Sequence, residues 1–184
     1  MIRRITASAV ASLAALGFAN VATAHSGHAA EVYKATLHAV DPAATKAGIP
    51  NVSGKGQLVD GYKRNKVTVH LRHLAPNTTY LWHVHVGSCA ATGAPVAGWT
   101  YRTQSGDNGT LTTNAAGNAN TKAWSTTFNA DPTKSYSINV HLAMATNGLP
   151  AGTVIACGDL NATKAGGKGK SKHPHPSQAK AAKS

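Results

Sequence analysis

Acidic side chains are scarce in this sequence, which has 6 Asp and Glu residues against 18 Lys and Arg. The excess of positive charge gathers at the ends, because Arg3 and Arg4 open the chain and six lysines follow Asn161. Nucleic-acid modules interleave arginine and aromatic side chains with their charges, and the C-terminal tail has neither. We therefore expect no nucleic-acid partner. Loose contact with anionic surfaces is the interaction that a solvated basic tail favours.

Long apolar runs are also missing, except near the N-terminus. Two arginines precede an apolar run that ends at Val21, and the small residues Ala22-Thr23-Ala24 follow it. This order is typical of a secretory signal peptide cleaved after Ala24. No second run is long enough to cross a bilayer. We expect a periplasmic or secreted protein with a signal peptide (1–24), a short N-terminal segment (25–31), a β domain (32–161) and a disordered Lys/Gly/His-Pro tail (162–184).

Cysteine is limited to Cys89 and Cys157. In an oxidising compartment, two cysteines are most simply interpreted as one disulfide. The entropy of loop closure would then stabilise the fold by about 4 kcal/mol. Two thiolate metal ligands are the alternative interpretation.

Helical periodicity is almost absent, and no internal repeat is visible. Short runs that favour β-strands alternate instead with turn residues, at 32–39, 54–62, 66–74, around His83, 122–128, 135–144 and 153–160. The Gly- and Thr-rich span 90–120 is typical of a long loop and an irregular hairpin. About eight short antiparallel strands with frequent turns predict an all-β Greek-key sandwich or barrel.

The segment 80–89 contains the pattern with the clearest chemical meaning. His83 and His85 are two residues apart, so in a strand they leave the same face, while Trp82 and Val84 leave the other. Two imidazoles on a stiff strand make half of a metal site. A pair of solvated surface histidines is the alternative.

A third histidine shares this placement. In segment 135–144, His141 leaves the polar face of a predicted strand, opposite an apolar face. His70 leaves the outer face of a strand that we expect to pair with the His83 strand, which would bring it near the site. His25 would offer an imidazole and a terminal amine after cleavage, and His173 and His175 a loose metal contact. Solvated histidines are the alternative for each of these extra residues.

Three stretches together resemble the copper/zinc superoxide dismutase superfamily, and they are also similar to exported chordin-type bacterial domains. They are His83-Val84-His85 with Gly87 and Cys89, Asn139-Val140-His141, and Ile155-Ala156-Cys157-Gly158. The resemblance covers about residues 32–160. It implies that His83, His85 and His141 are copper ligands and that Cys89 pairs with Cys157.

The sequence also departs from that family. No histidine lies between His85 and His141, where the resemblance would place the bridging histidine and other zinc ligands. Val154 stands where the family has the arginine that attracts superoxide. Three imidazoles still suit copper, which stands at the top of the divalent affinity order, so we expect copper. Zinc would also fit three histidines and a water, but the zinc ligands of the family are missing.

Three functional hypotheses follow. The first is an exported copper-binding protein that stores, buffers or delivers copper through His83, His85 and His141. The second is a copper-only superoxide dismutase with an altered fourth ligand, whose substrate would be superoxide. The third is a metal-free structural or interaction domain in which the histidines are solvated.

Overall fold

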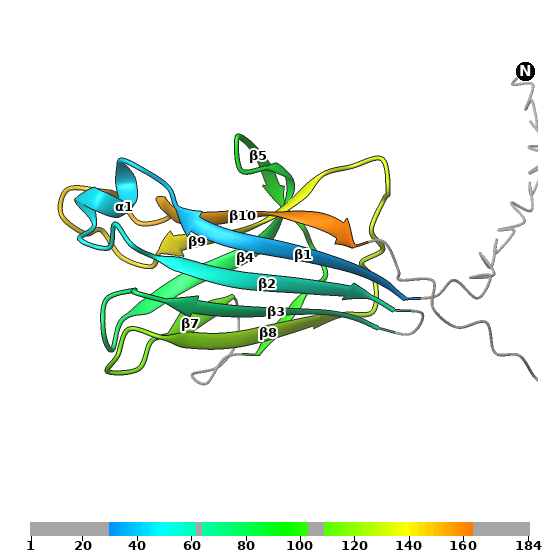
Figure 1. Ribbon diagram of the computed structural model, residues 1–184. Coiled ribbons are helices and arrows are strands. Elements are labelled where there is room, and N and C mark those ends of the chain that lie inside the picture. Colours follow the sequence, from blue (N-terminus) through cyan, green and yellow to red (C-terminus); the bar gives the residue numbers. More distant parts are fainter. Residues whose placement is uncertain (1–29, 62–63, 103–108, 164–184) are drawn as a thin grey trace, which may run out of the picture.

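The computed structural model describes residues 30–61, 64–102 and 109–163. This part of the chain forms ten strands in one curled antiparallel sheet and one short helix, α1 (Ala43–Lys46). Figure 1 shows how the sheet curls. The all-β fold class is therefore confirmed. The strands are β1 (Glu31–Ala39), β2 (Ser53–Asp60), β3 (Asn65–Arg72), β4 (Thr79–Ser88), β5 (Ala91–Pro95), β6 (Thr100–Arg102), β7 (Thr110–Thr112), β8 (Ala119–Ser125), β9 (Tyr136–Leu142) and β10 (Val154–Thr163).

The strand order is β5-β4-β9-β10-β1-β2-β3-β8-β6, with β7 paired to β4. Strands β1, β2 and β3 follow one another as antiparallel neighbours, and the last strand, β10, returns to lie beside β1. Strand β10 also pairs with β9, which precedes it in the chain, so β10 joins β1 to the strands on the other side of the molecule. The layer of β1, β2, β3 and β8 lies in front in Figure 1, and β4 and β9 lie behind it.

Alternation along the strands decides which side chains enter the core between the layers. Strand β3 buries Val67, Val69 and Leu71, while Thr68 between them is half-buried and His70 is exposed. Strand β4 buries Trp82 and Val84 completely. Because side chains alternate in a strand, the histidines of β4 must leave its outer face.

The span 90–120 is more regular than the sequence indicated. It contains β5, β6, β7 and the beginning of β8, where we expected a long loop and an irregular hairpin. Strand β6 pairs with β8, while β5 and β7 both pair with β4. Runs of three to five residues are too short to show a period-2 pattern, which explains why the sequence did not reveal them.

The predicted pairing of the His70 strand with the His83 strand is wrong. Strand β3 pairs with β2 and β8. The segment between β3 and β4 bonds to another loop, because Leu74 N–H donates to Gly117 O and Asn77 N–H donates to Asn114 O. It therefore carries the chain into the other layer and leaves His70 on a different strand pair from His83.

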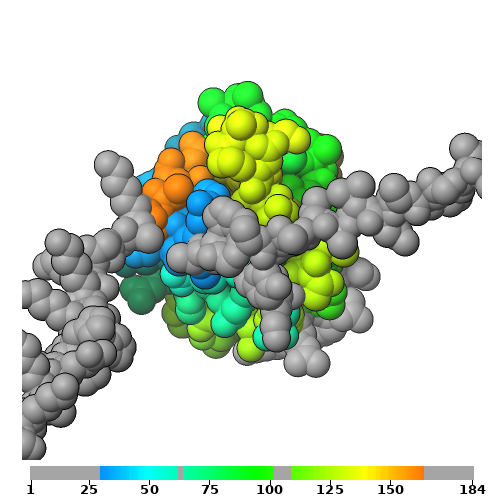
Figure 2. Space-filling model, turned by 90° about the vertical axis from the view of Figure 1, so that its right-hand side faces the viewer, coloured from blue at the N-terminus to red at the C-terminus, as the bar shows by residue number. Residues whose placement is uncertain are grey.

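The described part ends where β1 and β10 pair, with Val32 opposite Thr163. Figure 2 shows this end of the molecule, where the start of β1 (blue) and the end of β10 (orange) lie side by side. Strand β10 continues two residues past the expected domain boundary at Asn161. The expected signal peptide and the tail after Thr163 lie outside the described residues. Among the described residues, we find no helix with the length and apolar character of a membrane span.

Candidate metal centre

The site is built on two neighbouring strands, β4 and β9. Their antiparallel register places His83 opposite Asn139, His85 opposite Ser137 and Leu81 opposite His141. The inner faces of both strands carry core residues, so the three histidines share the outer face. Pairing of two strands far apart in the sequence therefore brings His141 diagonally beside His83.

The three imidazole rings converge on one point. Their centroids are separated by 6.0 Å for His83 and His85, 5.6 Å for His83 and His141, and 5.4 Å for His85 and His141. One nitrogen from each ring lies within 4.8 Å of the nitrogens of the other two. This cluster has the composition and the compactness needed to hold a metal ion.

A backbone carbonyl selects the tautomer of the neutral His85 ring. Its Nδ1 lies 2.9 Å from the carbonyl oxygen of Gly93. Because a carbonyl can only accept a hydrogen bond, Nδ1 must carry the proton, and Nε2 then presents a lone pair. That Nε2 is buried and has no hydrogen-bond partner within the described residues.

His141 is held in the same way. Its Nδ1 donates to the carbonyl oxygen of Gly152 over 2.9 Å, and its buried Nε2 also lacks a hydrogen-bond partner among the described residues. Buried polar atoms normally have a partner. Ligating histidines characteristically donate their second N–H to a carbonyl or carboxylate. The two nitrogens thus have the environment of metal ligands.

His83 is the most accessible of the three, and it is only half-buried. The ring of Tyr101 on β6 packs edge-on against it, with the centroids 5.6 Å apart. A Cβ atom at Gly109 would stand 2.9 Å from His83 Nε2, so glycine lets the chain pass close to this ring. His83 therefore connects the cluster with solvent.

Burial favours the neutral imidazole of His83 and of His141. It lowers the pKa of His83 to about 4, and charge on His141 and His85 would lower it further. Burial also lowers the pKa of His141, although the hydrogen bond to Gly152 acts in the opposite direction. Neutral imidazole is the form that binds metals, so at neutral pH no proton has to leave His83 or His141 before a metal binds.

A disulfide attaches the turn between β4 and β5 to β10. Cys89 and Cys157 are bonded, with their Cα atoms 5.8 Å apart, which confirms the expected disulfide and excludes the two thiolate ligands. The N–H of Cys89 also donates to Asp159 Oδ1 over 2.7 Å. These bonds attach the turn between β4 and β5 to β10, and β5 in turn supplies the carbonyl of Gly93.

The cluster leaves out some of the histidines considered from the sequence. His70 is exposed and its Nδ1 lies 2.6 Å from Asn120 Oδ1, outside the cluster. His25, His173 and His175 lie outside the described residues. In the described part of the chain, the metal-ligating group contains three histidines and no carboxylate or thiolate.

Other contributors gave no signal in the sequence. Gly93 and Gly152 act through their carbonyl oxygens, Gly109 through the absence of a side chain and Tyr101 through a ring contact. Any residue type has a carbonyl, so the sequence alone could not select the first two. The positions of the three histidines, by contrast, agree with the prediction.

Comparison with known proteins assigns no family to the chain: no family model matches it, and no curated protein matches it. The geometry and chemistry of the three-histidine cluster are therefore the basis for inferring a function.

Proposed function

We propose that this chain is an exported copper-binding protein with a superoxide dismutase-like fold, which binds, buffers or delivers copper through His83, His85 and His141. One observation carries the proposal. The Nε2 atoms of His85 and His141 are buried without a hydrogen-bond partner, and carbonyl oxygens hold the opposite nitrogens as donors. Both lone pairs are thus prepared for a cation that His83 can also reach.

Three histidines and a water suit zinc as well as copper, so the choice of copper depends on the order of metal affinities. Imidazole nitrogen suits both metals, but copper stands at the top of the divalent affinity order. Structural zinc sites usually have four protein ligands, often with thiolates. The described residues supply three histidines, and both cysteines are in the disulfide.

Three protein ligands suit binding and transfer of the metal. They leave a coordination position that water or a ligand of an acceptor protein can take. His83, the half-buried member, is where an exchanging ligand would approach. Copper could then pass between proteins without the buried pair having to unfold.

Superoxide dismutation is the second candidate, because the same coordination position would admit a small anion. Turnover also needs positive charge that guides superoxide to the metal. The residue at the place of the family's arginine is Val154, which has no charge. We therefore favour binding and delivery.

Competition between metals and an activity assay test the two candidates together. The full-length secreted protein should take up one equivalent of Cu²⁺ at the cluster in the presence of equimolar Zn²⁺, and His85→Ala should remove that preference. Equal uptake of zinc would contradict the choice of copper. Superoxide disproportionation above that of the same copper bound to a histidine peptide would favour the enzyme.

A further inference from the structure

The outer face of the layer formed by β1, β2, β3 and β8 carries positive charge without a carboxylate. We call the outward-facing residues of these four strands the basic face. Its cations are exposed and include Lys34, Lys55, Lys66, Arg72 and Lys122. None of these cations forms an ion pair within the described residues, where the salt bridge observed joins Lys134 and Asp131.

The strand register spreads these cations among hydrogen-bonding side chains. One row across the layer runs from Lys34 through Gln57 and Thr68 to Lys122. The next row runs from Thr36 through Lys55 and His70 to Asn120. Neighbours lie roughly 5 Å apart across strands and roughly 7 Å apart along them. The basic face therefore offers charges and polar groups at spacings comparable to the units of a sugar polymer.

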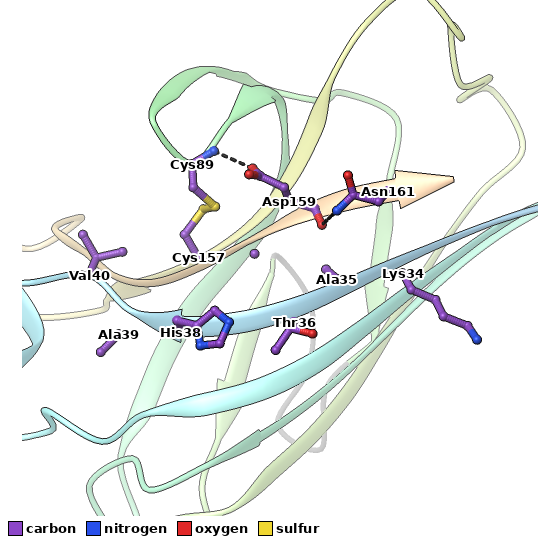
Figure 3. A pocket seen from close by; sticks show the side chains of 11 residues that line it. Lys34, Ala35, Thr36, His38, Ala39, Val40, Cys89, Cys157, Asp159 and Asn161 are labelled. Atoms are coloured by element: carbon purple, nitrogen blue, oxygen red, sulfur yellow. Dashed lines mark hydrogen bonds between the residues drawn. A yellow bond between two sulfur atoms is a disulfide. The ribbon is translucent and has the colours of Figure 1, made fainter. Parts of the chain in front are cut away.

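A groove borders the basic face, between β1 and β10 beside the disulfide (Figure 3). Its volume is about 480 Å³. Lys34, Thr36 and His38 line it on the β1 side, and Asp159 and Asn161 line it on the β10 side. The Asp159 carboxylate already accepts the N–H of Cys89. The groove thus offers a small volume with donors and acceptors that suit hydroxyl groups.

We propose that the basic face and its groove bind an acidic polysaccharide. The lysines and Arg72 pair with carboxylate or sulfate groups of the polymer, while the polar side chains and the groove bond its hydroxyls. The metal cluster lies on β4 and β9, so this surface is separate from the proposed copper site. Polysaccharide binding at this surface does not depend on copper binding at the cluster.

Two other anionic partners fit less well. A membrane-docking surface needs apolar side chains that enter the lipid interface. Among the described residues, the exposed large apolar side chains are Val86 and Met144, and neither lies on the basic face. Single-stranded nucleic acid needs aromatic rings on which bases stack. The ring of Trp124 already has Lys122 and Arg64 over it, 5.2 and 5.9 Å from its centroid.

Binding of the full-length protein to immobilised dextran sulfate and polygalacturonate tests the proposal, with neutral dextran as the negative control. We expect both acidic polymers to bind. The variant Lys34→Gln/Lys55→Gln/Arg72→Gln/Lys122→Gln should bind them about tenfold or more weakly, because several exposed charge contacts are lost. Lys55→Gln/Lys122→Gln should show a smaller loss, which keeps the test valid if the larger variant folds poorly.

A matched tail variant separates the basic face from the C-terminal lysines. It carries Lys168→Gln, Lys170→Gln, Lys172→Gln and Lys180→Gln and loses the same amount of charge. We expect it to bind within about twofold of the wild type. Loss of binding in the tail variant alone would overturn the proposal. Tighter binding of inorganic polyphosphate or of phosphatidylglycerol vesicles than of either polysaccharide would also overturn it. Copper uptake should be unchanged in the face variant, so loss of polysaccharide binding can be distinguished from loss of the metal site.

Discussion

Asn139 on β9 donates a hydrogen bond from Nδ2 to Thr92 Oγ1 on β5, over 3.2 Å. The next residue of β5 is Gly93, whose carbonyl accepts the Nδ1–H of His85. On its other side, Asn139 Oδ1 lies 2.8 Å from Cys157 Sγ. Asn139 is fully buried. Its side chain contacts the disulfide and strand β5, and β5 in turn holds the candidate ligand His85.

Replacing this amide should weaken the metal site without removing a ligand. In Asn139→Leu, strand β5 loses its side-chain hydrogen bond to β9, and Gly93 no longer holds the ring of His85 in place. Removal of such outer partners typically costs about 10–100-fold in metal affinity, and we expect a loss in this range. Competition with a copper chelator measures it.

The control is Asn120→Leu, which changes an exposed asparagine on β8 that bonds to His70. It should leave copper affinity unchanged. If Asn139→Leu also retained the wild-type affinity while remaining folded, the positioning role of Asn139 would be wrong.

Gly109→Ala should disturb His83. The new Cβ would stand 2.6 Å from the carbonyl oxygen of Trp82 and 2.9 Å from His83 Nε2, at a φ of +70°. The positive φ alone costs about 1–2 kcal/mol, and the contacts add to it. We expect a lower free energy of unfolding in urea and weaker copper binding.

Gly48→Ala separates strain from contact. Gly48 has a similar φ of +82°, but its Cβ would meet nothing within 4 Å. This variant should lose stability by the backbone strain alone and bind copper as the wild type does. Equal copper affinity in the two variants would show that the approach of Gly109 to His83 is unimportant.

The stability of the metal-free protein should depend on pH. The pKa of His83 falls to about 4 in the folded protein, from 6.5 in an unperturbed histidine, chiefly because of burial. Between these values the unfolded chain binds more protons, so the free energy of unfolding rises with pH across this window. Burial of His141 acts in the same direction. Urea unfolding at a series of pH values measures the slope.

The variant His83→Gln should show a smaller slope over the same window, because one of the contributing groups is gone. An identical slope in the variant and the wild type would mean that His83 titrates normally.

The disulfide should support both the fold and the site. It closes a loop with a sequence separation of 68 residues. Removing a cross-link that closes a loop of this length costs about 4 kcal/mol of stability in the chain-entropy model. Cys89→Ser/Cys157→Ser should therefore unfold at lower urea concentration. It should also bind copper more weakly, because Gly93 follows the released end of the loop. Wild-type copper affinity in this variant would disconnect the loop from the site.

The sequence was sufficient to predict the central part of the site. His83 and His85 alternate with Trp82 and Val84, and the structure confirms their opposite faces. The same alternation placed His141 on the outer face of β9. Period-2 patterning is a local property, so it is legible in a single sequence where strands are long enough.

Long-range pairing was harder to infer. Sequence order suggested a hairpin between β3 and β4, and the error placed His70 near the site. What decides the pairing is a set of backbone hydrogen bonds between residues 74–77 and 114–117, which no side-chain pattern records. The carbonyls of Gly93 and Gly152 were unpredictable for the same reason.

The proposed function requires that the three converging imidazoles hold copper. Its most direct test is a calorimetric copper titration of the full-length protein, beside His141→Ala and His70→Ala. All three proteins retain the terminal histidines, so differences report the cluster. We predict that His141→Ala weakens binding of the first copper by more than the roughly 10–100-fold of an outer partner, and that His70→Ala has no effect. Equal affinity of the wild type and His141→Ala would contradict copper binding at the cluster.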